Sequence, residues 1–513
     1  MLLVRGEIPA GVAGAASGGP GLPGVRDGGV LVEGERIAAV GEYARLRADH
    51  PAADEIGSAG HLLLPGLVDA HDHARGLGHA QGGVADGPLE TWVLLLEDCP
   101  DIGPYLSALW SGILLIESGV TTVMHDYIPS ARMGLADGAR AALRAYDELG
   151  LRVGLGVPFF DQNALSLDDD AFLAGLPPDL APPARAWADT RAGLPVGEYE
   201  AIVADLARAV RAEHPRARLL VSPAGPWRCG DAMLARLTAF ARAHGLGRHL
   251  HLLETRYQRA LGARAYDGHT LVERLAELEA LGPDLTCAHG VWLTRRDIAL
   301  LADAGCPVAH NASSNLRLRS GIAPVPAMLA AGLTVGLGLD GVALDDDQDF
   351  LREMRLCATL QAYPGIGAPD VGPAQVLRMA TAGGARAVLG ADDPPGRLEP
   401  GAPADLTLVR QGRMRAPFTH PRVDALELML RRGTAADVDS VLVAGRVVMR
   451  ERRLTGVDRA DVAARVAEAA ERALRDAPAP PPWRDALLGQ LRRFYRGWAE
   501  PPLEPYCARN SAS

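Results

Sequence analysis

Residues 62 to about 390 repeat one pattern: an apolar run of strand length, a loop, and a stretch with helical periodicity. The eight apolar runs are expected to end near His71, His125, Pro158, Pro223, Leu253, His289, His310 and Asp340. The helical stretches between them include Pro104–Ser118, Asp137–Leu149, Gly197–Glu213, Asp231–His244 and Arg295–Ala304. Eight such units in succession predict an α/β fold, a closed (β/α)8 TIM-type barrel. Functional groups in such barrels lie at the C-terminal ends of the strands.

Sequence of β type flanks this region on both sides. Short alternating runs broken by glycine occupy residues 1–60, and similar runs return over 393–455. We expect both parts to form one small β domain, with the barrel spanning 61–392. Residues 456–513 are expected to form a helical tail, in which 457–475 is amphipathic. Its aromatic and basic end, Phe494–Trp498, either docks on a partner subunit, which would favour a homodimer, or packs on its own chain.

The first barrel strand ends in the polar run His71-Asp72-His73. Because side chains alternate along a strand, His71 and His73 project to the same side and Asp72 projects to the other. Two imidazoles two residues apart can bind one cation, and the strand fixes both rings in advance.

Polar residues also follow several later strands. His249 and His251 share one side of a strand, and Glu254 follows at its exit. The remaining polar strand ends are His289, His310 and Asp340. A metal ligand with a carboxylate just beyond it suits metal-assisted hydrolysis, since the metal lowers the pKa of its water and the carboxylate moves protons.

These segments, in this order, resemble the amidohydrolase superfamily, in the branch of cytosine, guanine, adenosyl-homocysteine and chlorotriazine aminohydrolases. The resemblance is carried by Pro65–His73, His251–Glu254, Ala288-His289, His310–Asn315 and Leu339–Gly341. It implies a (β/α)8 barrel with a split β-sandwich domain. By the same resemblance, His71, His73, His251 and Asp340 would be metal ligands, Glu254 a proton shuttle, and His289 a group that polarises the substrate or holds the attacking water. His310 and Asn315 match a segment that faces the substrate. Asp72 departs from the small or apolar residue that usually stands between the two histidines.

Long connections follow the first strand (Ala74–Gly103) and the third strand (Phe159–Pro195). Long loops at this end of a barrel usually cover or select a substrate. Further candidate substrate-binding residues are Arg75, His79, Gln81, Trp92, Trp227 and Arg228. An arginine among them would favour a carbonyl, carboxylate or phosphate group on the ligand.

Composition excludes several kinds of chemistry. All 52 basic residues are arginine, so the chain cannot form a lysine Schiff base or a carbamylated lysine that bridges two metals. The missing lysine fits members of the superfamily that hold one metal. A net charge of -11 argues against nucleic-acid and acidic-membrane partners. With neither a long apolar run nor a signal segment in the sequence, a cytoplasmic location is the expectation.

We therefore expect a hydrolase that deaminates a heteroaromatic or cyclic amidine small molecule, such as a purine, pyrimidine, pterin or triazine. One divalent metal would activate the water, with Zn²⁺ the first choice and Fe²⁺ fitting the same ligands. Glu254, His289 and Asp340 would be the catalytic residues. One alternative keeps the site but opens a cyclic amide, or displaces chloride or an alkylamine from a triazine-like ring. A second alternative is a non-catalytic scaffold.

Overall fold

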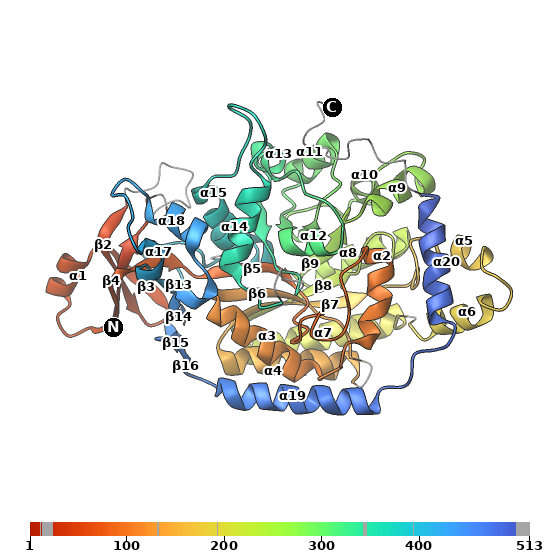
Figure 1. Ribbon diagram of the computed structural model, residues 1–513, viewed down its shortest axis with the longest axis horizontal. Helices are drawn as coiled ribbons and strands as arrows, with labels where there is room; N and C mark the ends of the chain where they lie inside the picture. Colours follow the sequence, from red (N-terminus) through yellow and green to blue (C-terminus); the bar gives the residue numbers. More distant parts are fainter. Residues whose placement is uncertain are drawn as a thin grey trace.

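A parallel barrel forms the centre of the computed structural model (Figure 1), which describes residues 1–10, 12, 24–130, 133–191, 193–341, 346–392 and 394–498. Its sheet runs in the order β12-β11-β10-β9-β8-β7-β6-β5. The strands are β5 (Leu67–Asp72), β6 (Val120–Asp126), β7 (Arg152–Phe159), β8 (Ala217–Pro223), β9 (Gly247–Leu252), β10 (Leu285–His289), β11 (Val308–His310) and β12 (Val335–Leu337). Most of their residues are buried on both faces, because helices cover the outside.

The first and last strands meet through hydrogen bonds just beyond β12. The backbone N–H of Asp340 donates to the carbonyl of His71 at 2.8 Å. The N–H of Leu339 donates to Oδ1 of Asp69 at 3.1 Å. These bonds bring the two ends of the barrel sequence together, so groups at the ends of β5 and β12 are neighbours.

The helices alternate with the strands as the periodicity predicts. Those of the barrel and its loops are α2 (Leu89–Trp92), α3 (Pro104–Glu117), α4 (Leu135–Leu149), α5 (Asp169–Ala174), α6 (Ala181–Asp189), α7 (Val196–Glu213), α8 (Asp231–Ala243), α9 (Arg256–Ala265), α10 (Leu271–Glu277), α11 (Arg295–Asp303), α12 (Ala312–Arg317), α13 (Val325–Ala330), α14 (Phe350–Leu360), α15 (Pro373–Arg378) and α16 (Gly384–Leu389). The described helices include none that is long and apolar enough to cross a membrane.

A second sheet draws strands from both ends of the chain, in the order β16-β15-β14-β13-β4-β1-β2-β3. These strands are β1 (Leu2–Ile8), β2 (Val25–Glu33), β3 (Arg36–Glu42), β4 (Asp54–Pro65), β13 (Leu406–Arg410), β14 (Val438–Val443), β15 (Arg446–Arg450) and β16 (Arg453–Leu454). The short helices α1 (Tyr43–Asp49), α17 (Gly412–Arg415) and α18 (Ala425–Arg432) accompany it. The expected fold class, a barrel with a small β domain built from both chain ends, is confirmed.

The apolar stretch before His71 is divided between the two sheets. His61–Pro65 pairs with β13 in the small sheet, whereas Leu67–Asp72 pairs with β6 in the barrel. Gly66 separates the two parts. A Cβ there would lie 2.2 Å from Oγ1 of Thr121, so only glycine allows the chain to pass this close to β6. The bounds expected from the sequence place His61–Pro65 with the barrel, because the apolar run alone does not show where the sheet changes.

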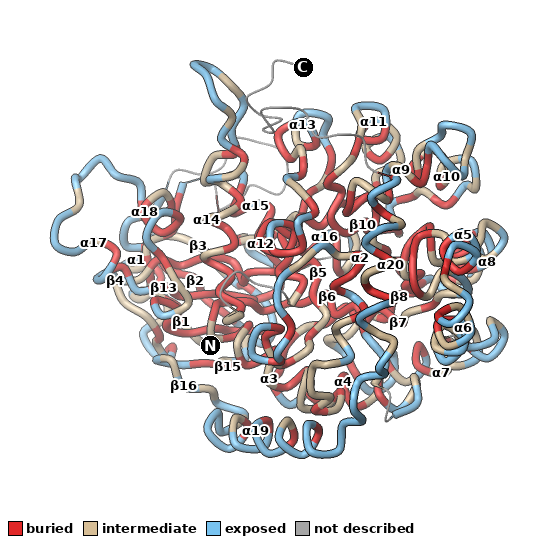
Figure 2. Tube along the Cα trace, turned by 45° about the vertical axis from the view of Figure 1, so that its right-hand side comes forward, coloured by how far each residue is buried: buried red, intermediate tan, exposed pale blue. Residues whose placement is uncertain are grey.

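The C-terminal region packs on its own chain. Helix α19 (Arg459–Asp476) runs along α3 on the outside of the molecule and is largely exposed (Figure 2). Helix α20 (Arg484–Arg496) lies beside the loops that follow β5 and β7 (Figure 1). Of the expected domain ranges, residues 11, 13–23, 131–132, 192, 342–345, 393 and 499–513 lie outside the described residues.

Candidate active site

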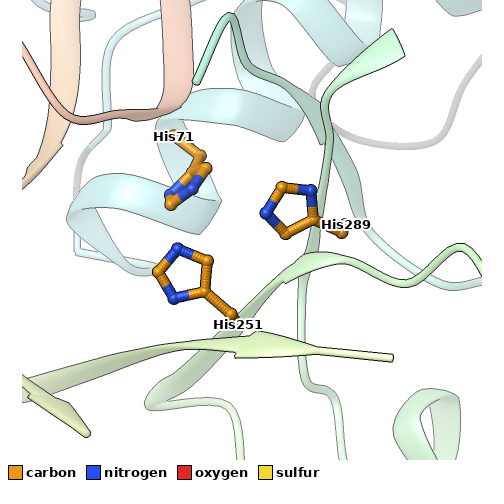
Figure 3. Close-up of side chains that lie close together, drawn as sticks. All are labelled: His71, His251 and His289. Atoms are coloured by element: carbon orange, nitrogen blue, oxygen red, sulfur yellow. The ribbon is translucent and has the colours of Figure 1, made fainter. Parts of the chain in front are cut away.

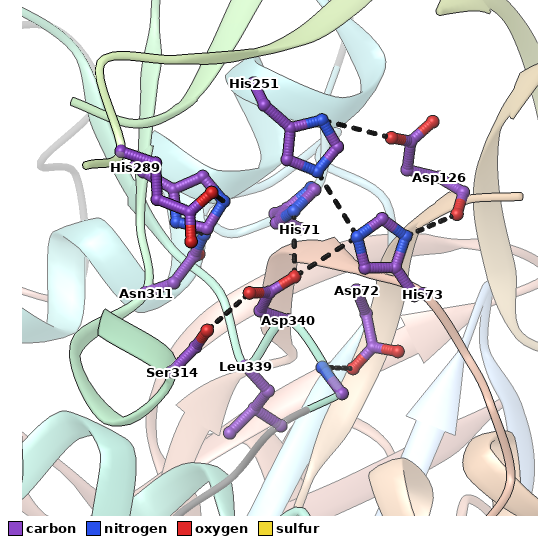
Figure 4. A network of polar contacts seen from close by, with 12 residues as sticks. His71, Asp72, His73, Asp126, His251, His289, Asn311, Ser314, Leu339 and Asp340 are labelled. Carbon is purple, nitrogen blue, oxygen red and sulfur yellow. Dashed lines mark hydrogen bonds and ion pairs between the residues drawn. The ribbon is translucent and has the colours of Figure 1, made fainter. Parts of the chain in front are cut away.

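Four side chains converge at the C-terminal end of the barrel, three of them imidazoles and one a carboxylate. Oδ1 of Asp340 lies 3.1 Å from Nε2 of His71 and 3.3 Å from Nε2 of His73 (Figure 4). Nε2 of His251 lies 3.3 Å from Nε2 of His73. The strand ends of β5 and β9 supply the histidines, and the turn after β12 supplies the aspartate. Residues far apart in the sequence thus become neighbours through barrel closure.

The donor set fits one divalent metal. In a tetrahedral site with Zn–N bonds of 2.0–2.1 Å, neighbouring ligand atoms are about 3.3 Å apart, close to the separations observed here. Nε2 of His71 is buried without a hydrogen-bond partner among the described residues. Burial lowers the pKa of His71 and His73 well below the usual range and that of His251 to about 4, so all three rings are neutral and can donate a lone pair. A second set of side chains that could hold a metal ion consists of His71, His251 and His289, and it shares His71 and His251 with the first set (Figure 3).

Each of the three rings is held through its other nitrogen. Nδ1 of His73 lies 2.8 Å from the carbonyl oxygen of Asp126, and Nδ1 of His251 lies 2.9 Å from that of Ala224. Nδ1 of His71 lies 2.8 Å from Nε2 of His249. Such partners fix the orientation and tautomer of a ligating histidine. The sequence does not reveal the partners at Asp126 and Ala224, because the backbone carbonyl oxygens and not the side chains hold the rings.

His249 is the side chain in this outer set whose role the sequence did not reveal. A His71 ring that keeps its Nε2 lone pair for a metal carries its proton on Nδ1 and donates it to His249. We expect His249→Ala to weaken metal binding about 10- to 100-fold, the usual effect of losing such a partner. Titration of metal-free protein with Zn²⁺ against a chromophoric chelator measures this effect. The exposed His244→Ala is the control, and an unchanged dissociation constant in the His249 variant would refute the role.

Glu254 and His289 form a second buried pair beside the first cluster. Oε2 of Glu254 lies 3.7 Å from Nε2 of His289. Burial raises the pKa of Glu254 to about 7, while the nearby His289 opposes the shift. Ser320 Oγ donates to Oε1 of Glu254 at 3.3 Å. A carboxyl group with a pKa near neutrality can both give and take a proton at neutral pH.

The segment after β11 forms hydrogen bonds with His289 and Asp340. Nδ1 of His289 lies 3.0 Å from Oδ1 of Asn315. Ser314 Oγ donates to Oδ2 of Asp340. The structure therefore places Asn315, a candidate substrate residue, against the far nitrogen of His289. His310 is buried at the end of β11. The support from Ser314 has no local sequence signature, because it depends on how α12 packs.

Four residues at the strand exits have left-handed backbone conformations although none is glycine. The φ angles are 44° at Ala74, 47° at Leu253, 75° at His289 and 62° at Asp340. Each such residue costs about 1–3 kcal/mol and persists only where the surroundings enforce it. Two of these residues, His289 and Asp340, carry side chains of the site, so the strained backbone is concentrated where the site is built.

The remaining candidate residues lie on the loops in different surroundings. His79 is buried, with its ring centroid 4.7 Å from that of the buried Trp92. Gln81 is exposed, and its Oε1 accepts from the N–H of Gly78 at 3.3 Å. Arg228 donates to the carbonyls of Asn163 and Ala164 at 3.2 and 3.1 Å, bracing the loop after β7.

Trp227 and Asp72 also hold loops in place. Trp227 is buried beside Arg228, and its carbonyl accepts from the amide of Asn163 at 2.6 Å. Oδ2 of Asp72 accepts from the N–H of Gly341 at 3.1 Å and from Gln348 at 3.3 Å. Asp72, which departs from the family pattern, thus fixes the turn that carries Asp340.

Polar contacts that the sequence did not reveal connect the loop after β5 to the segments that follow β9 and β11. Arg317 forms ion pairs with Asp86 and with Asp346. Thr255, next to Glu254, donates to the buried Glu90, whose pKa burial raises to about 7.

A (β/α)8 barrel with clustered imidazoles, a carboxylate and a buried acid at its C-terminal end has the groups of a hydrolase and a cluster that could hold a metal ion. The chain belongs to the amidohydrolase family, whose model matches residues 62–448. A model of the bacterial imidazolonepropionase-like composite domain matches residues 28–53. The expected family is confirmed.

Three enzymes illustrate what this chain is similar to. A 5-methylthioadenosine/S-adenosylhomocysteine deaminase of Desulforudis audaxviator is 34% identical over 84% of this chain and 91% of its own. The crystal structure of an adenosine deaminase from Xanthomonas campestris with bound zinc is 26% identical, with a TM-score of 0.74 over 92% of this chain and 98% of that one. The zinc complex of atrazine chlorohydrolase from Arthrobacter aurescens, at 22% identity, shares the fold, with a TM-score of 0.75 over 92% of this chain and 100% of that one. The expectation of an enzyme that hydrolyses carbon–nitrogen bonds other than peptide bonds is confirmed, against the scaffold alternative.

Proposed function

We propose that this enzyme hydrolytically deaminates a purine-like heteroaromatic amine, using water activated by one Zn²⁺. One observation carries the proposal: a buried acid of pKa about 7, Glu254, lies within 3.7 Å of His289 and beside the cluster of three imidazoles and Asp340. The deaminase relatives support the choice of reaction. The bound zinc in the Xanthomonas structure supports the choice of metal over Fe²⁺.

When bound, the metal held by His71, His73, His251 and Asp340 would lower the pKa of a water molecule to about 7. Asp340 accepts a proton from the attacking water, since its Oδ1 faces the imidazole cluster and Ser314 holds its Oδ2. The water oxygen attacks the carbon that carries the amino group.

Glu254 protonates the ring nitrogen next to that carbon, and its pKa near 7 lets it exchange the proton during each turnover. His289 stabilises the charge that develops on the substrate. Proton transfer to the amino group then releases ammonia.

The reaction is tested with metal-loaded enzyme and a panel of aminated purines, pyrimidines, pterins and triazines, with ammonia as the readout. Ammonia in equal amount to the deaminated product supports the proposal. A ring-opened product, chloride or an alkylamine, with no ammonia, would favour the closely related alternative in which the same site opens a cyclic amide or displaces a ring substituent.

Metal removal should abolish activity reversibly. We expect dialysis against a chelator to reduce ammonia release at least about 10³-fold and to lower the melting temperature, because a ligand that binds the native state stabilises it. Zn²⁺ and Fe²⁺ are then added back separately under anaerobic conditions. Full activity in the chelated enzyme with less than one-tenth of a metal per chain would contradict the proposal, and recovery with Fe²⁺ alone would replace zinc with iron.

We also propose a cytoplasmic homodimer that binds neither nucleic acid nor membrane. The aromatic end of the tail packs on its own chain, where Tyr495 accepts a hydrogen bond from the N–H of Leu167 at 2.8 Å. Light scattering of the full chain gives the oligomeric state.

A further inference from the structure

Arg75 is the arginine nearest to the candidate metal ligands in sequence. It follows His73 by two residues, and the left-handed Ala74 turns the chain between them. Its side chain is half-buried and makes no hydrogen bond or ion pair with any described residue. Other arginines at this end are paired: Arg317 with Asp86 and Asp346, and Arg191 with Glu97. A half-buried guanidinium without a partner is unusual, since burial of an uncompensated charge is costly.

The charge of Arg75 reaches the candidate site. It interacts electrostatically with Asp340 and with His79. The guanidinium stays protonated in proteins, so it is a fixed cation in the loop that follows His73.

His79 adds a second polar side chain that has no hydrogen-bond partner among the described residues. Its side chain is 1% exposed, and neither ring nitrogen has a hydrogen-bond partner among the described residues. Burial lowers its pKa to about 3, so the ring is neutral and offers one donor and one acceptor. Trp92 lies against this ring in a T-shaped contact, with the ring centroids 4.7 Å apart. Two polar side chains of one loop, both without a hydrogen-bond partner among the described residues, thus interact electrostatically with Asp340.

We propose that Arg75 and His79 form a specificity subsite that binds an oxygen acceptor on the substrate's ring, so that the preferred substrate is an oxo-substituted aminoheterocycle. This inference rests on the proposed deamination. The planar fork of Arg75 can donate to a ring carbonyl oxygen and to an adjacent ring nitrogen at once, and His79 can donate to or accept from the same edge. A substrate that lacks the oxygen leaves the cation uncompensated, and sites built in this way reject such analogues strongly.

The experiment compares matched substrates that differ in the acceptor oxygen. The pairs are cytosine with 4-aminopyrimidine, and guanine with 2-aminopurine. S-adenosylhomocysteine with 5'-methylthioadenosine tests whether a carboxylate on a substituent supplies the oxygen instead. Values of kcat/KM for ammonia release are measured for wild type, Arg75→Gln and, as control, the exposed Arg259→Gln, with metal content determined for each protein.

We expect the wild type to prefer the oxo member of at least one ring pair by 100-fold or more. Arg75→Gln should reduce that preference below 10-fold with unchanged metal content, whereas Arg259→Gln should retain it. His79→Ala should lower kcat/KM for the same oxo member. The subsite would be overturned if Arg75→Gln lowered kcat/KM equally for both members of each pair. It would also be overturned if Arg75→Gln kept the wild-type preference for the oxo member. A preference confined to the S-adenosylhomocysteine pair would overturn the ring assignment and move the oxygen to the substituent.

A binding measurement separates failure of the subsite from failure of the proposed deamination. If none of these compounds releases ammonia from metal-loaded enzyme, binding of uracil and xanthine, which carry ring oxygens and no amine, is measured by calorimetry. Binding at least 10-fold tighter to wild type than to Arg75→Gln would support the subsite on its own. Equal binding to both proteins, or binding to neither, would overturn it.

Discussion

Glu254→Gln is expected to lower kcat for ammonia release about 10²- to 10⁴-fold while metal content remains at the wild-type level. Glutamine keeps the shape of the side chain and can still accept from Ser320, but it cannot take up and release a proton. The buried pair with His289, 3.7 Å away, keeps its geometry, so the loss reports proton transfer and not collapse of the site. Steady-state kinetics with elemental analysis of the same preparation give both quantities.

The matched control is Glu468→Gln, on the exposed face of α19, which should leave kcat unchanged. Turnover of the Glu254 variant at more than half the wild-type rate, with metal bound, would remove Glu254 from the proton path.

Asp340→Asn is expected to lower both metal occupancy and activity, the latter by at least about 10³-fold. The substitution removes the negative charge that faces His71 and His73 and leaves an amide that is a poor ligand and a poor proton acceptor. Asparagine is suited to this test, because it tolerates the left-handed φ of 62° that position 340 requires. The fold should therefore persist, and circular dichroism should match that of the wild type.

Metal occupancy is measured after dialysis against buffered Zn²⁺, and the exposed Asp303→Asn serves as the control. Wild-type occupancy together with wild-type kcat in the Asp340 variant would contradict both of its proposed roles.

The barrel could be predicted because its strands are apolar runs buried on both faces, and each ends within three residues of the position expected from the sequence. The candidate ligands could be predicted because strand ends place polar side chains at one end of a barrel. The switch of sheets at Gly66 could not, because it depends on the contact with Thr121 from another strand. Backbone partners such as the carbonyls of Asp126 and Ala224 leave no trace in residue identity.

The loops were the least predictable part, for a physical reason. Arg228 looked like a substrate-reading arginine, yet its donors are bound to the carbonyls of Asn163 and Ala164. Arg75, of the same residue type, is left without a partner among the described residues. The sequence shows that a guanidinium is present, whereas three-dimensional packing decides whether the protein provides hydrogen-bond acceptors for it.

The position of helix α20 near the end of the chain determines when the two long loops can be fixed during synthesis. Tyr495 binds the loop after β7, and Arg484 pairs with Asp98 in the loop after β5, so one helix holds both long loops. It follows every barrel strand in chain order, about 150 residues after β12. At translation rates of about 5–20 residues per second, the ribosome completes the barrel roughly 8 to 30 seconds before α20 can dock. During that interval the candidate metal ligands lie under two long loops that α20 does not yet hold in place.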